Sequence, residues 1–184
     1  MVHNLYIPAG GDIADPVANP KFAHKLAFLD EMNGWFAGGI PGLDRAILVG
    51  DLNVAPLEQD VWSHKQLLDV VSHTPVETEA MKRMMATGGW IDVMRRFVPE
   101  PEKLYTWWSY RAADWVAANR GRRLDHVWAS ASLAPAARAM NVLREARGWP
   151  RPSDHVPVSV AFDLSALGPS PTTEPPGLHL RTGR

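Results

Sequence analysis

The sequence predicts a mixed α/β (α+β) domain in which β-strands pack as a two-sheet sandwich with helices on the outside. The chain has 184 residues, which is enough for one domain with a hydrophobic core. Its first half alternates short apolar runs with long helical patterns, and its second half changes to four successive strand patterns. We expect residues 1–164 to form the domain. Residues 165–184 are rich in proline and have few apolar side chains, so we expect a disordered tail there.

The first elements follow from local signals. Residues 4–8 (NLYIP) read as the end of a strand, and the glycines after them indicate a loop. Asn19 and Pro20 predict a helix with Asn as its cap and Pro at its first position, and Gly38 and Gly39 predict its end. Its apolar stripe would consist of Phe22, Leu26, Leu29 and either Trp35 or Phe36.

The stretch 46–53 (AILVGDLN) predicts a buried strand that ends in polar residues. Ile47, Leu48 and Val49 are apolar, and Gly50 closes the run. Asp51 and Asn53 follow two positions apart, so on an extended chain they point the same way. Such a pair can hold a metal-bound water and a phosphate oxygen. The alternative is an ordinary turn, because Gly, Asp and Asn all favour turns.

The remaining elements follow in order. A loop that contains Pro56, Asp60 and Trp62 leads to a helix over 77–87, with its methionines facing inward as core filler. A second, shorter helix is predicted over 90–97. The predicted strands of the second half are residues 105–110, 124–130, 139–144 and 156–162.

Composition narrows the setting and the partner. The chain has no Cys, which excludes disulfides and thiolate metal sites. It has no apolar run near the ~20 residues of a membrane span and does not open with a signal-peptide pattern, so we expect a cytoplasmic protein. Residues 82–151 carry 13 Lys and Arg against 6 Asp and Glu, whereas residues 1–81 carry 4 against 11. This basic segment suits a nucleic-acid backbone, although scattered arginines on a solvated surface would give the same count.

Four further pieces carry polar or aromatic groups at predicted strand ends or in loops. They are Tyr6, the segment 105–111 (YTWWSYR), the segment 119–126 (NRGRRLDH) and the segment 152–157 (PSDHVP). Each has an ordinary structural interpretation, such as a turn cap for Asp154 or a core position for His155 and Trp107. Together, several carboxylates and one histidine suit a hard cation such as Mg²⁺ and proton transfer at a phosphodiester.

In these segments the sequence resembles the exodeoxyribonuclease III/AP endonuclease family of DNA-repair nucleases, within the endonuclease/exonuclease/phosphatase superfamily. The matching text is NLYIPAGG, NPKFAHKLAFLDEM, VGDLNVAP, SHTPVE, YTWWSYR, NRGRRLDHVWAS and PSDHVPV, in order over residues 4–163. The resemblance implies a metal-dependent DNA phosphodiesterase, a 3′-5′ exodeoxyribonuclease or abasic-site endonuclease. It would use Mg²⁺ (or Mn²⁺), act on double-stranded DNA with abasic sites or 3′ ends, and be a monomer when complete.

The resemblance also implies roles for individual residues. Tyr6 would contact the scissile phosphate, Asp51 would orient or deprotonate the attacking water, and Asn53 would hold the phosphate or that water. Asp125 would pair with His155, so that the imidazolium can bind a phosphate oxygen. The metal ligands would be Asp154 and Asp51, and the DNA-contacting residues Trp107, Arg111, Asn119, Arg122 and Arg123.

The sequence also departs from the family pattern. Members of the family open with a strand that carries an Asn and a strand that ends in Gln-Glu-Thr, whose Glu is the principal metal ligand, and no Gln-Glu-Thr occurs here. We therefore expect an N-terminally truncated sandwich that lacks its first strands and has impaired cleavage. Ala9 replaces an amide side chain that is common in relatives. The alternatives are a catalytically inactive fragment that only binds DNA, or a phosphatase or lipid phosphodiesterase of the same superfamily.

Overall fold

The computed structural model describes residues 1–39 and 43–168. Its strands are β1 Val2–Asn4, β2 Ile47–Asp51, β3 Trp90–Asp92, β4 Trp107–Trp108, β5 Gly121–Arg122, β6 Asp125–Ser130, β7 Ala137–Val142 and β8 Val158–Phe162. Its α-helices are α1 Pro20–Ala37, α2 His64–Leu67, α3 Pro75–Thr87, α4 Met94–Phe97 and α5 Trp115–Ala118. Short 3-10 helices span Glu58–Asp60, Ala134–Ala136, Arg144–Gly148 and Leu164–Ala166.

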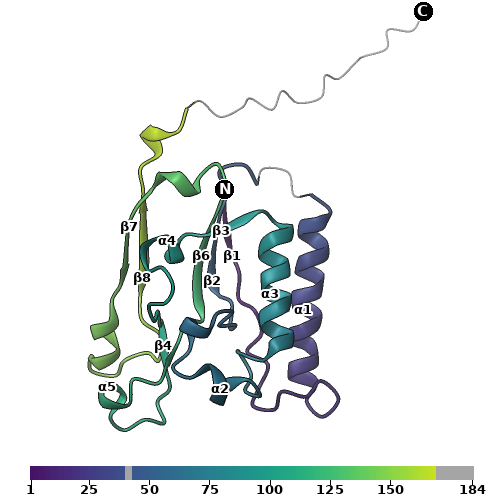
Figure 1. The fold of residues 1–184 in the computed structure, drawn as a ribbon, viewed down its shortest axis with the longest axis vertical. Coiled ribbons are helices and arrows are strands. Elements are labelled where there is room, and N and C mark those ends of the chain that lie inside the picture. The colour runs from purple at the N-terminus through teal and green to yellow at the C-terminus, as the bar shows by residue number, and fades with distance from the viewer. Residues whose placement is uncertain (40–42, 169–184) are drawn as a thin grey trace, which may run out of the picture.

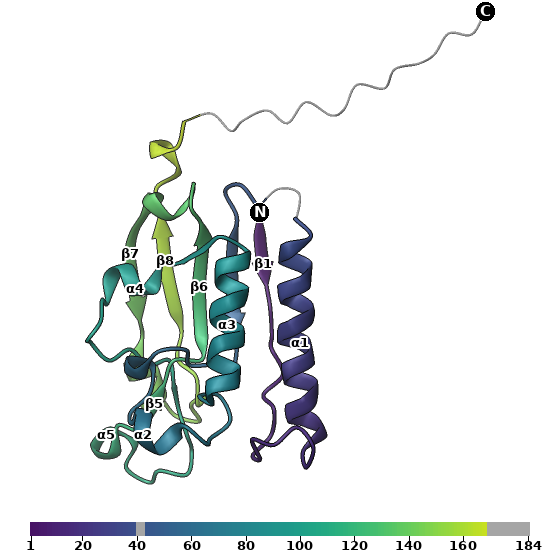
Figure 2. The same ribbon diagram turned by 45° about the vertical axis from the view of Figure 1, so that its right-hand side comes forward.

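The predicted sandwich of two sheets with outer helices is confirmed. The four-stranded sheet has the order β1-β2-β6-β3, with β1 parallel to β2 and the other pairs antiparallel. In Figures 1 and 2, α1 and α3 lie side by side against this sheet, and the β7–β8 pair lies on its other side. One core cluster joins the sheet to the helices through Leu48, Trp128, Leu29 and Met84, among others. A second joins it to β8, whose Val158, Val160 and Phe162 pack toward Val127 and Ala129.

The helix α1 follows the sequence signals closely. The side chain of Asn19 accepts a hydrogen bond from the backbone N–H of Lys21, Pro20 occupies the first turn, and Gly38 is the C-cap. Of the two aromatic candidates for its buried stripe, Phe36 is buried and Trp35 is 47% exposed. The unexpected member of the stripe is Lys25, which is completely buried.

Several predicted boundaries differ from the structure by one or two residues, and three elements differ in more than that. The first strand is β1 at Val2–Asn4, earlier than the predicted 4–8, although Leu5 and Ile7 still donate backbone hydrogen bonds to β2. The predicted helix over 90–97 is wrong at its start, because Trp90–Asp92 pairs with β6 and only Met94–Phe97 is helical. The predicted strand over 105–110 is reduced to Trp107–Trp108.

The predicted disordered tail, 165–184, falls mostly on residues 169–184, which lie outside the described part of the chain. The predicted start of the tail overlaps a short 3-10 helix, Leu164–Ala166, so the first residues of the predicted tail are ordered. Among the described residues, no helix has the length and apolar character needed to cross a membrane.

Candidate functional site

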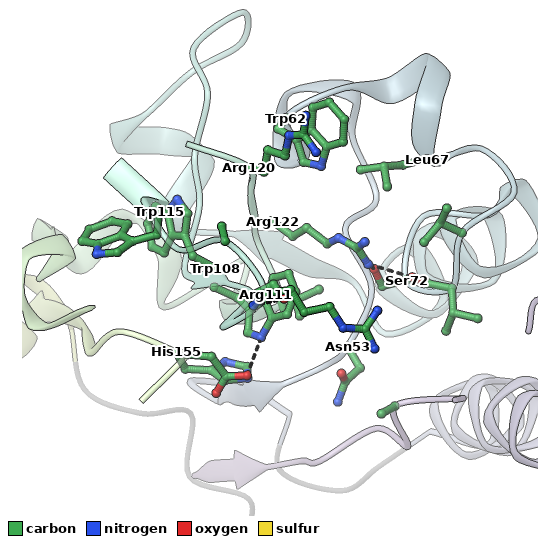
Figure 3. Close-up of a pocket in the computed structure, with 18 of the residues that line it drawn as sticks. Asn53, Trp62, Leu67, Ser72, Trp108, Arg111, Trp115, Arg120, Arg122 and His155 are labelled. Atoms are coloured by element: carbon green, nitrogen blue, oxygen red, sulfur yellow. Dashed lines mark hydrogen bonds between the residues drawn. The ribbon is translucent and has the colours of Figure 1, made fainter. Parts of the chain in front are cut away.

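Most of the predicted site residues line one open cleft with a volume of about 1190 Å³. The cleft lies where β2, α2 and the β4–β5 pair come together, and Figure 3 shows several of its side chains. The predicted residues in its wall are Tyr6, Asp51, Asn53, Trp107, Arg111, Arg122, Asp154 and His155. The structure therefore brings together residues that are up to 149 positions apart in the sequence.

The Asp51 and Asn53 pair is joined by a tight turn at the end of β2. Asn53 has a left-handed backbone (φ 51°), a conformation that Asn tolerates better than most residues. Its backbone N–H donates to Oδ1 of Asp51 and its side-chain amide donates to Oδ2, each at 3.0 Å, and the same amide donates to the carbonyl of Ile7 at 2.9 Å. The sequence left open whether Asp51 and Asn53 form an ordinary turn or a functional pair. In the structure they do both, because the turn itself lines the cleft.

Gly50 allows the chain after β1 to run directly beside this turn. Its φ is 139°, and a Cβ added to it would lie 1.9 Å from the carbonyl oxygen of Leu5. Leu5 in turn donates its N–H to Val49, and Ile7 donates to Asp51. This close approach requires glycine, and it places Tyr6, which is 66% exposed, at the rim of the cleft.

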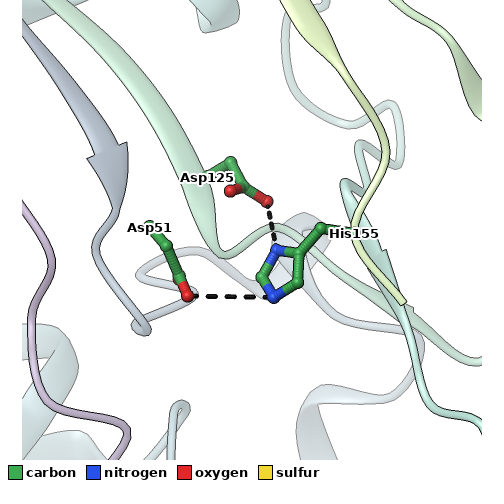
Figure 4. Close-up of side chains that lie close together, drawn as sticks. All are labelled: Asp51, Asp125 and His155. Atoms are coloured by element: carbon green, nitrogen blue, oxygen red, sulfur yellow. Dashed lines mark hydrogen bonds and ion pairs between the residues drawn. The ribbon is translucent and has the colours of Figure 1, made fainter. Parts of the chain in front are cut away.

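Two residues of the cleft wall, Asp51 and His155, form a cluster with Asp125 that contains two carboxylates and one imidazole. Asp51 on β2 lies directly opposite Asp125 on β6 in the antiparallel register. The Nδ1 of His155 is 2.8 Å from Oδ2 of Asp125, and its Nε2 is 3.7 Å from Oδ2 of Asp51 (Figure 4). Two like charges directly opposite on neighbouring strands repel each other, and the imidazole lies where it offsets that repulsion.

The electrostatics of this cluster shift two pKa values. Burial raises the pKa of Asp51, and the neighbouring Asp125 raises it further, against the lowering effect of His155. Burial alone would lower the pKa of His155, but the hydrogen bond and charge of Asp125, together with Asp51 and Asp154, raise it above its ordinary value. The fold therefore favours an imidazolium at His155.

A short antiparallel ladder carries His155 to this position. Val156 donates its N–H to the carbonyl of Thr106 and Trp108 donates to the carbonyl of Asp154, with a bridge between Trp107 and His155. The indole N–H of Trp107 donates to Oδ2 of Asp154 at 3.0 Å. Backbone hydrogen bonds therefore hold the segments 105–111 and 152–157 next to each other.

Thr106 is a site residue that the sequence analysis missed. Its hydroxyl is completely buried and accepts hydrogen bonds from the backbone N–H groups of Leu124 and Asp125, each at 3.1 Å. It therefore holds the start of β6, and with it the carboxylate of Asp125. Its only signal in the sequence is its place in the YTWW run, beside the two tryptophans that drew attention.

The opposite wall of the cleft is basic and aromatic. The guanidinium of Arg122 lies 5.3 Å from the ring centre of Trp107, and that of Arg120 lies 4.7 Å from the ring centre of Trp62. Arg122 also donates to Ser72 Oγ at 2.7 Å and to the carbonyl of Val71 (Figure 3). Arg111, also in the wall, is exposed. This wall has the charge and the ring surfaces to meet a phosphate backbone and a base.

Two of the predicted DNA-contacting residues do not line the cleft. Arg123 is completely buried and forms ion pairs with Asp60 and Asp92, so the prediction that it contacts DNA is wrong. Asn119 is exposed but ends α5 in a left-handed conformation (φ 43°), and its Oδ1 accepts hydrogen bonds from Trp108 and Arg144. Within the described residues its contacts are those of a loop-positioning residue.

The cluster has the donor chemistry for a cation. One ligand atom each from Asp51, Asp125 and His155 lie within 4.8 Å of one another, and they are the only such group in the described part of the chain. Asp154, a third acidic side chain, also lines the cleft and accepts a hydrogen bond from the indole N–H of Trp107. Carboxylate oxygens are the ligands that hard divalent cations prefer, so the residues present fit a metal ion.

The fold and the site define an α/β sandwich protein with an acidic, histidine-containing centre in a cleft beside its sheets. The model of the endonuclease/exonuclease/phosphatase family matches residues 2–155, and the chain belongs to this family. The resemblance to exodeoxyribonuclease III and AP endonucleases is confirmed by individual relatives. The chain is 34% identical to an exodeoxyribonuclease of Bacillus subtilis (strain 168) over 118 residues, which is 64% of this chain and 44% of that one. It is 31% identical to the DNA repair nuclease APEX1 of Danio rerio over 77% of this chain and 46% of that one.

Solved structures give the same result. An AP endonuclease from Archaeoglobus fulgidus matches with a TM-score of 0.80 at 29% identity, over 88% of this chain and 61% of that one. A Neisseria 3′ phosphatase, NExo, bound to a product DNA hairpin, matches with a TM-score of 0.79 at 29% identity, over 88% and 60%. The chain spans between 44% and 61% of the length of the curated relatives that it matches.

Proposed function

We propose that this site belongs to a metal-dependent DNA phosphodiesterase of DNA repair, acting as a 3′-5′ exodeoxyribonuclease or abasic-site endonuclease. The observation that carries the proposal is the Asp125–His155–Asp51 cluster in a cleft whose other wall is an arginine stacked on a tryptophan. An acid–base cluster facing a phosphate-binding wall is what hydrolysis of a nucleic-acid backbone needs. Membership of the endonuclease/exonuclease/phosphatase family and the names of the relatives support it.

The proposed chemistry starts from the pairing of His155 with Asp125. The carboxylate fixes the ring, so the Nε2–H of the imidazolium faces the cleft and binds a phosphate oxygen. Asp51, whose oxygen faces the same Nε2 at 3.7 Å, orients the attacking water and accepts its proton. Both side-chain N–H groups of Asn53 are already used on Asp51 and Ile7, so Asn53 acts mainly by fixing the Asp51 carboxylate.

Asp51 and Asp154, which both line the cleft, would hold Mg²⁺ (or Mn²⁺), and Asp125 remains paired with His155. The bound cation stabilises the negative charge that develops on the phosphate in the transition state. Asp154 is held in place by the indole of Trp107, so a single tryptophan contacts both the metal-binding side and the DNA-binding side of the cleft.

Double-stranded DNA with abasic sites or 3′ ends is the proposed substrate. Arg122 and the exposed Arg111 would contact phosphates, and Trp107 would lie beside the abasic or terminal nucleotide. Tyr6 stands at the rim with its ring 66% exposed, free to contact the scissile phosphate.

The test is incubation of the purified chain with Mg²⁺ and two labelled duplexes, one with a single abasic site and one with recessed 3′ ends. Because the sequence has no Gln-Glu-Thr glutamate, we expect weak strand cleavage. A chelator should abolish it, Asp51→Asn should remove it, and the control variant Asp30→Asn on the exposed face of α1 should leave it intact. A chain that binds both duplexes in a salt-dependent way but cuts neither would replace this proposal with a DNA-binding module. Release of phosphate from small phosphoesters without action on DNA would replace it with a phosphatase.

A further inference from the structure

The helices α1 and α3 are joined by an ion pair that is entirely removed from water. The Nζ of Lys25 is 2.5 Å from Oε1 of Glu77, and both side chains have no exposed surface. A buried ion pair is a weak source of stability, because the loss of hydration of both charges offsets their attraction. A pair of apolar side chains would serve the helix packing equally well, so the other contacts of the two charges are informative.

On one side, the ammonium of Lys25 holds the turn that carries the reactive carboxylate. Its Nζ donates to the carbonyl of Asn53 at 2.7 Å and reaches the carbonyl of Ala9 at 3.4 Å. Asn53 has the left-handed backbone described above and donates both its N–H and its side-chain amide to Asp51. Gly10 covers the stem of the lysine, since a Cβ added there would lie 2.8 Å from its Cδ.

On the other side, Glu77 holds the segment that accepts hydrogen bonds from the cleft arginine, Arg122. Both of its carboxylate oxygens accept from the backbone N–H of Ser72 at 3.0 Å, and Oε2 also accepts from the N–H and hydroxyl of Thr74. Ser72 has a left-handed backbone with φ 86°, and its hydroxyl accepts from Arg122 at 2.7 Å. Its carbonyl accepts from Ala55 at 2.7 Å, which closes the circuit back to the Asn53 turn.

We infer that Lys25 and Glu77 are positioning residues of the cleft, a buried charge pair that sets the Asn53 turn and the Ser72 segment in one frame and thereby places Asp51 relative to Arg122. Unfavourable backbone conformations persist where the surrounding structure imposes them. Two non-glycine residues of the cleft wall, Asn53 and Ser72, have a positive φ, and the Lys25–Glu77 pair bonds directly to both. The catalytic part of the inference rests on the proposed function, whereas the coupling of the two segments does not.

The structure also offers a matched comparison for a merely structural role. The ion pair between Arg123 and Asp92 is equally buried on its arginine side, at 2.6 Å, but its contacts lead to Asp60 and not to the Asn53 turn. Asp92→Asn therefore removes one largely buried charge interaction that makes no contact with the Asn53 turn or the Ser72 segment. If the Lys25–Glu77 pair only stabilised the fold, the loss of either ion pair would have the same effect on the cleft.

The first experiment needs no DNA. Hydrogen exchange would be followed at the amides of Asn53, Ala55 and Ser72 in the wild type, in Lys25→Arg, in Asp92→Asn and in the double variant Lys25→Met/Glu77→Gln, which keeps the side-chain volume but removes both charges. We expect exchange at these amides to become about tenfold faster in the double variant, through local opening of the two segments. Lys25→Arg should stay near the wild type, and Asp92→Asn should leave these amides unchanged although it lowers the melting temperature.

The second experiment measures cleavage of the abasic duplex by the same four proteins. Misplacing a reactive group by about 1 Å costs about 10²-fold, so kcat should fall by that factor in the double variant with little change in KM. The Lys25→Arg variant, which keeps the charge, should retain a kcat near that of the wild type. Unchanged exchange at Asn53 and Ser72 in the double variant overturns the inference, as does an equal loss of kcat in Asp92→Asn. If exchange becomes faster in the double variant but the wild type does not cut DNA, the positioning role is upheld and only the proposed function is refuted.

Discussion

This domain contains two groups of charged side chains that balance their charges in different ways. In the buried group, Asp60 accepts two hydrogen bonds from Arg123 and one from Arg95, and Asp92 accepts another from Arg123. In the cleft group, Asp51 and Asp125 face each other across the sheet with His155 alone between them. The buried group balances its charges with fixed cations, and the cleft group balances them with a group that titrates.

Their pKa values record this difference. Burial would raise the pKa of Asp60, but Arg123 and Arg95 lower it below its ordinary value. Burial raises the pKa of Asp51, and no fixed cation of comparable strength reverses the shift. A carboxylate that the fold leaves in an unfavourable charged state is available for chemistry, whereas one that is fully paired contributes to structure. The predictions below test this contrast, starting from the largest expected effect.

Asp51→Asn should separate function from stability most sharply. The variant removes the proposed proton acceptor, so kcat for cleavage of an abasic duplex should fall by about 10²–10⁴-fold. The raised pKa of Asp51 means that its charge disfavours the folded state, so the melting temperature at neutral pH should stay the same or rise. Cleavage assays and thermal unfolding of the same preparation decide it, and a large drop in melting temperature would contradict the contrast.

Arg123→Met should do the reverse. It leaves the carboxylates of Asp60 and Asp92 buried with one cation fewer, which should lower the free energy of unfolding by about 3–5 kcal/mol. Denaturant unfolding measures this, with Arg122→Met as the neighbouring control. Because Arg123 does not reach the surface, the salt dependence of DNA binding should remain that of the wild type in the protein that still folds. A flatter salt dependence in this variant would restore Arg123 to the DNA-contacting surface.

The pH dependence of the cleft should show the His155 imidazolium. Its pKa is raised in the folded protein, so protonation stabilises the fold. This stabilisation is complete below the ordinary value near 6.5 and is lost as the pH rises through the higher folded value. An NMR titration of His155, with unfolding curves at pH 6 and pH 9 compared between the wild type and His155→Gln, measures both effects. Titration at or below 6.5 would show that Asp125 does not hold the ring as described.

Trp107→Ala should weaken lesion preference. Stacking of a base on an aromatic ring is worth about 1–3 kcal/mol. The preference for abasic over intact duplex, expressed as a difference in binding free energy, should therefore decrease by an amount of this order. Competition binding at fixed salt gives the ratio, and Trp35→Ala, at an exposed site on α1, is the control. If the ratio is kept while both affinities fall together, Trp107 acts only as the support of Asp154.

Arg122→Ala should give the smallest effect, on the salt dependence of binding. One lost phosphate contact should reduce the slope of log affinity against log salt by about one unit. Fluorescence titrations over a range of salt concentrations measure the slope, with Arg138→Ala, at a half-exposed position on β7, as the matched control. An unchanged slope would mean that the bonds of Arg122 to Ser72 and Val71 keep its charge away from DNA.

Local patterns predicted much of this fold, and contacts between distant segments account for most of the failures. The cap at Asn19, the strand that ends at Asp51 and the pairing of His155 with Asp125 were all foreseeable, because short motifs and a family resemblance carry them. Trp90–Asp92 read as helix because its pairing with β6 is not visible locally. Arg122 ends β5 and Arg123 follows it, and the sequence does not show which of these two successive side chains faces the core.

Lys25 shows another limit. A charged residue on an apolar helix stripe looks like an interruption of the pattern, and nothing nearby in the sequence identifies Glu77, 52 positions later, as its partner. The need to satisfy a buried charge becomes visible only when both helices are in place. Thr106 escaped notice for the same reason, since its hydroxyl serves backbone groups that lie 18 and 19 positions away.

The crowding at Gly50 has a consequence for how mutational maps of this protein should be interpreted. A methyl group there would collide with the carbonyl of Leu5 and push the following segment, with Tyr6 and the Ile7 carbonyl that anchors Asn53, away from the cleft. In a saturation screen scored by the proposed DNA cleavage, every substitution at Gly50 should rank beside those at Asp51, although Gly50 contributes no side chain to the site. Screens of this kind therefore identify the residues that shape the cleft together with those that are proposed to perform the reaction.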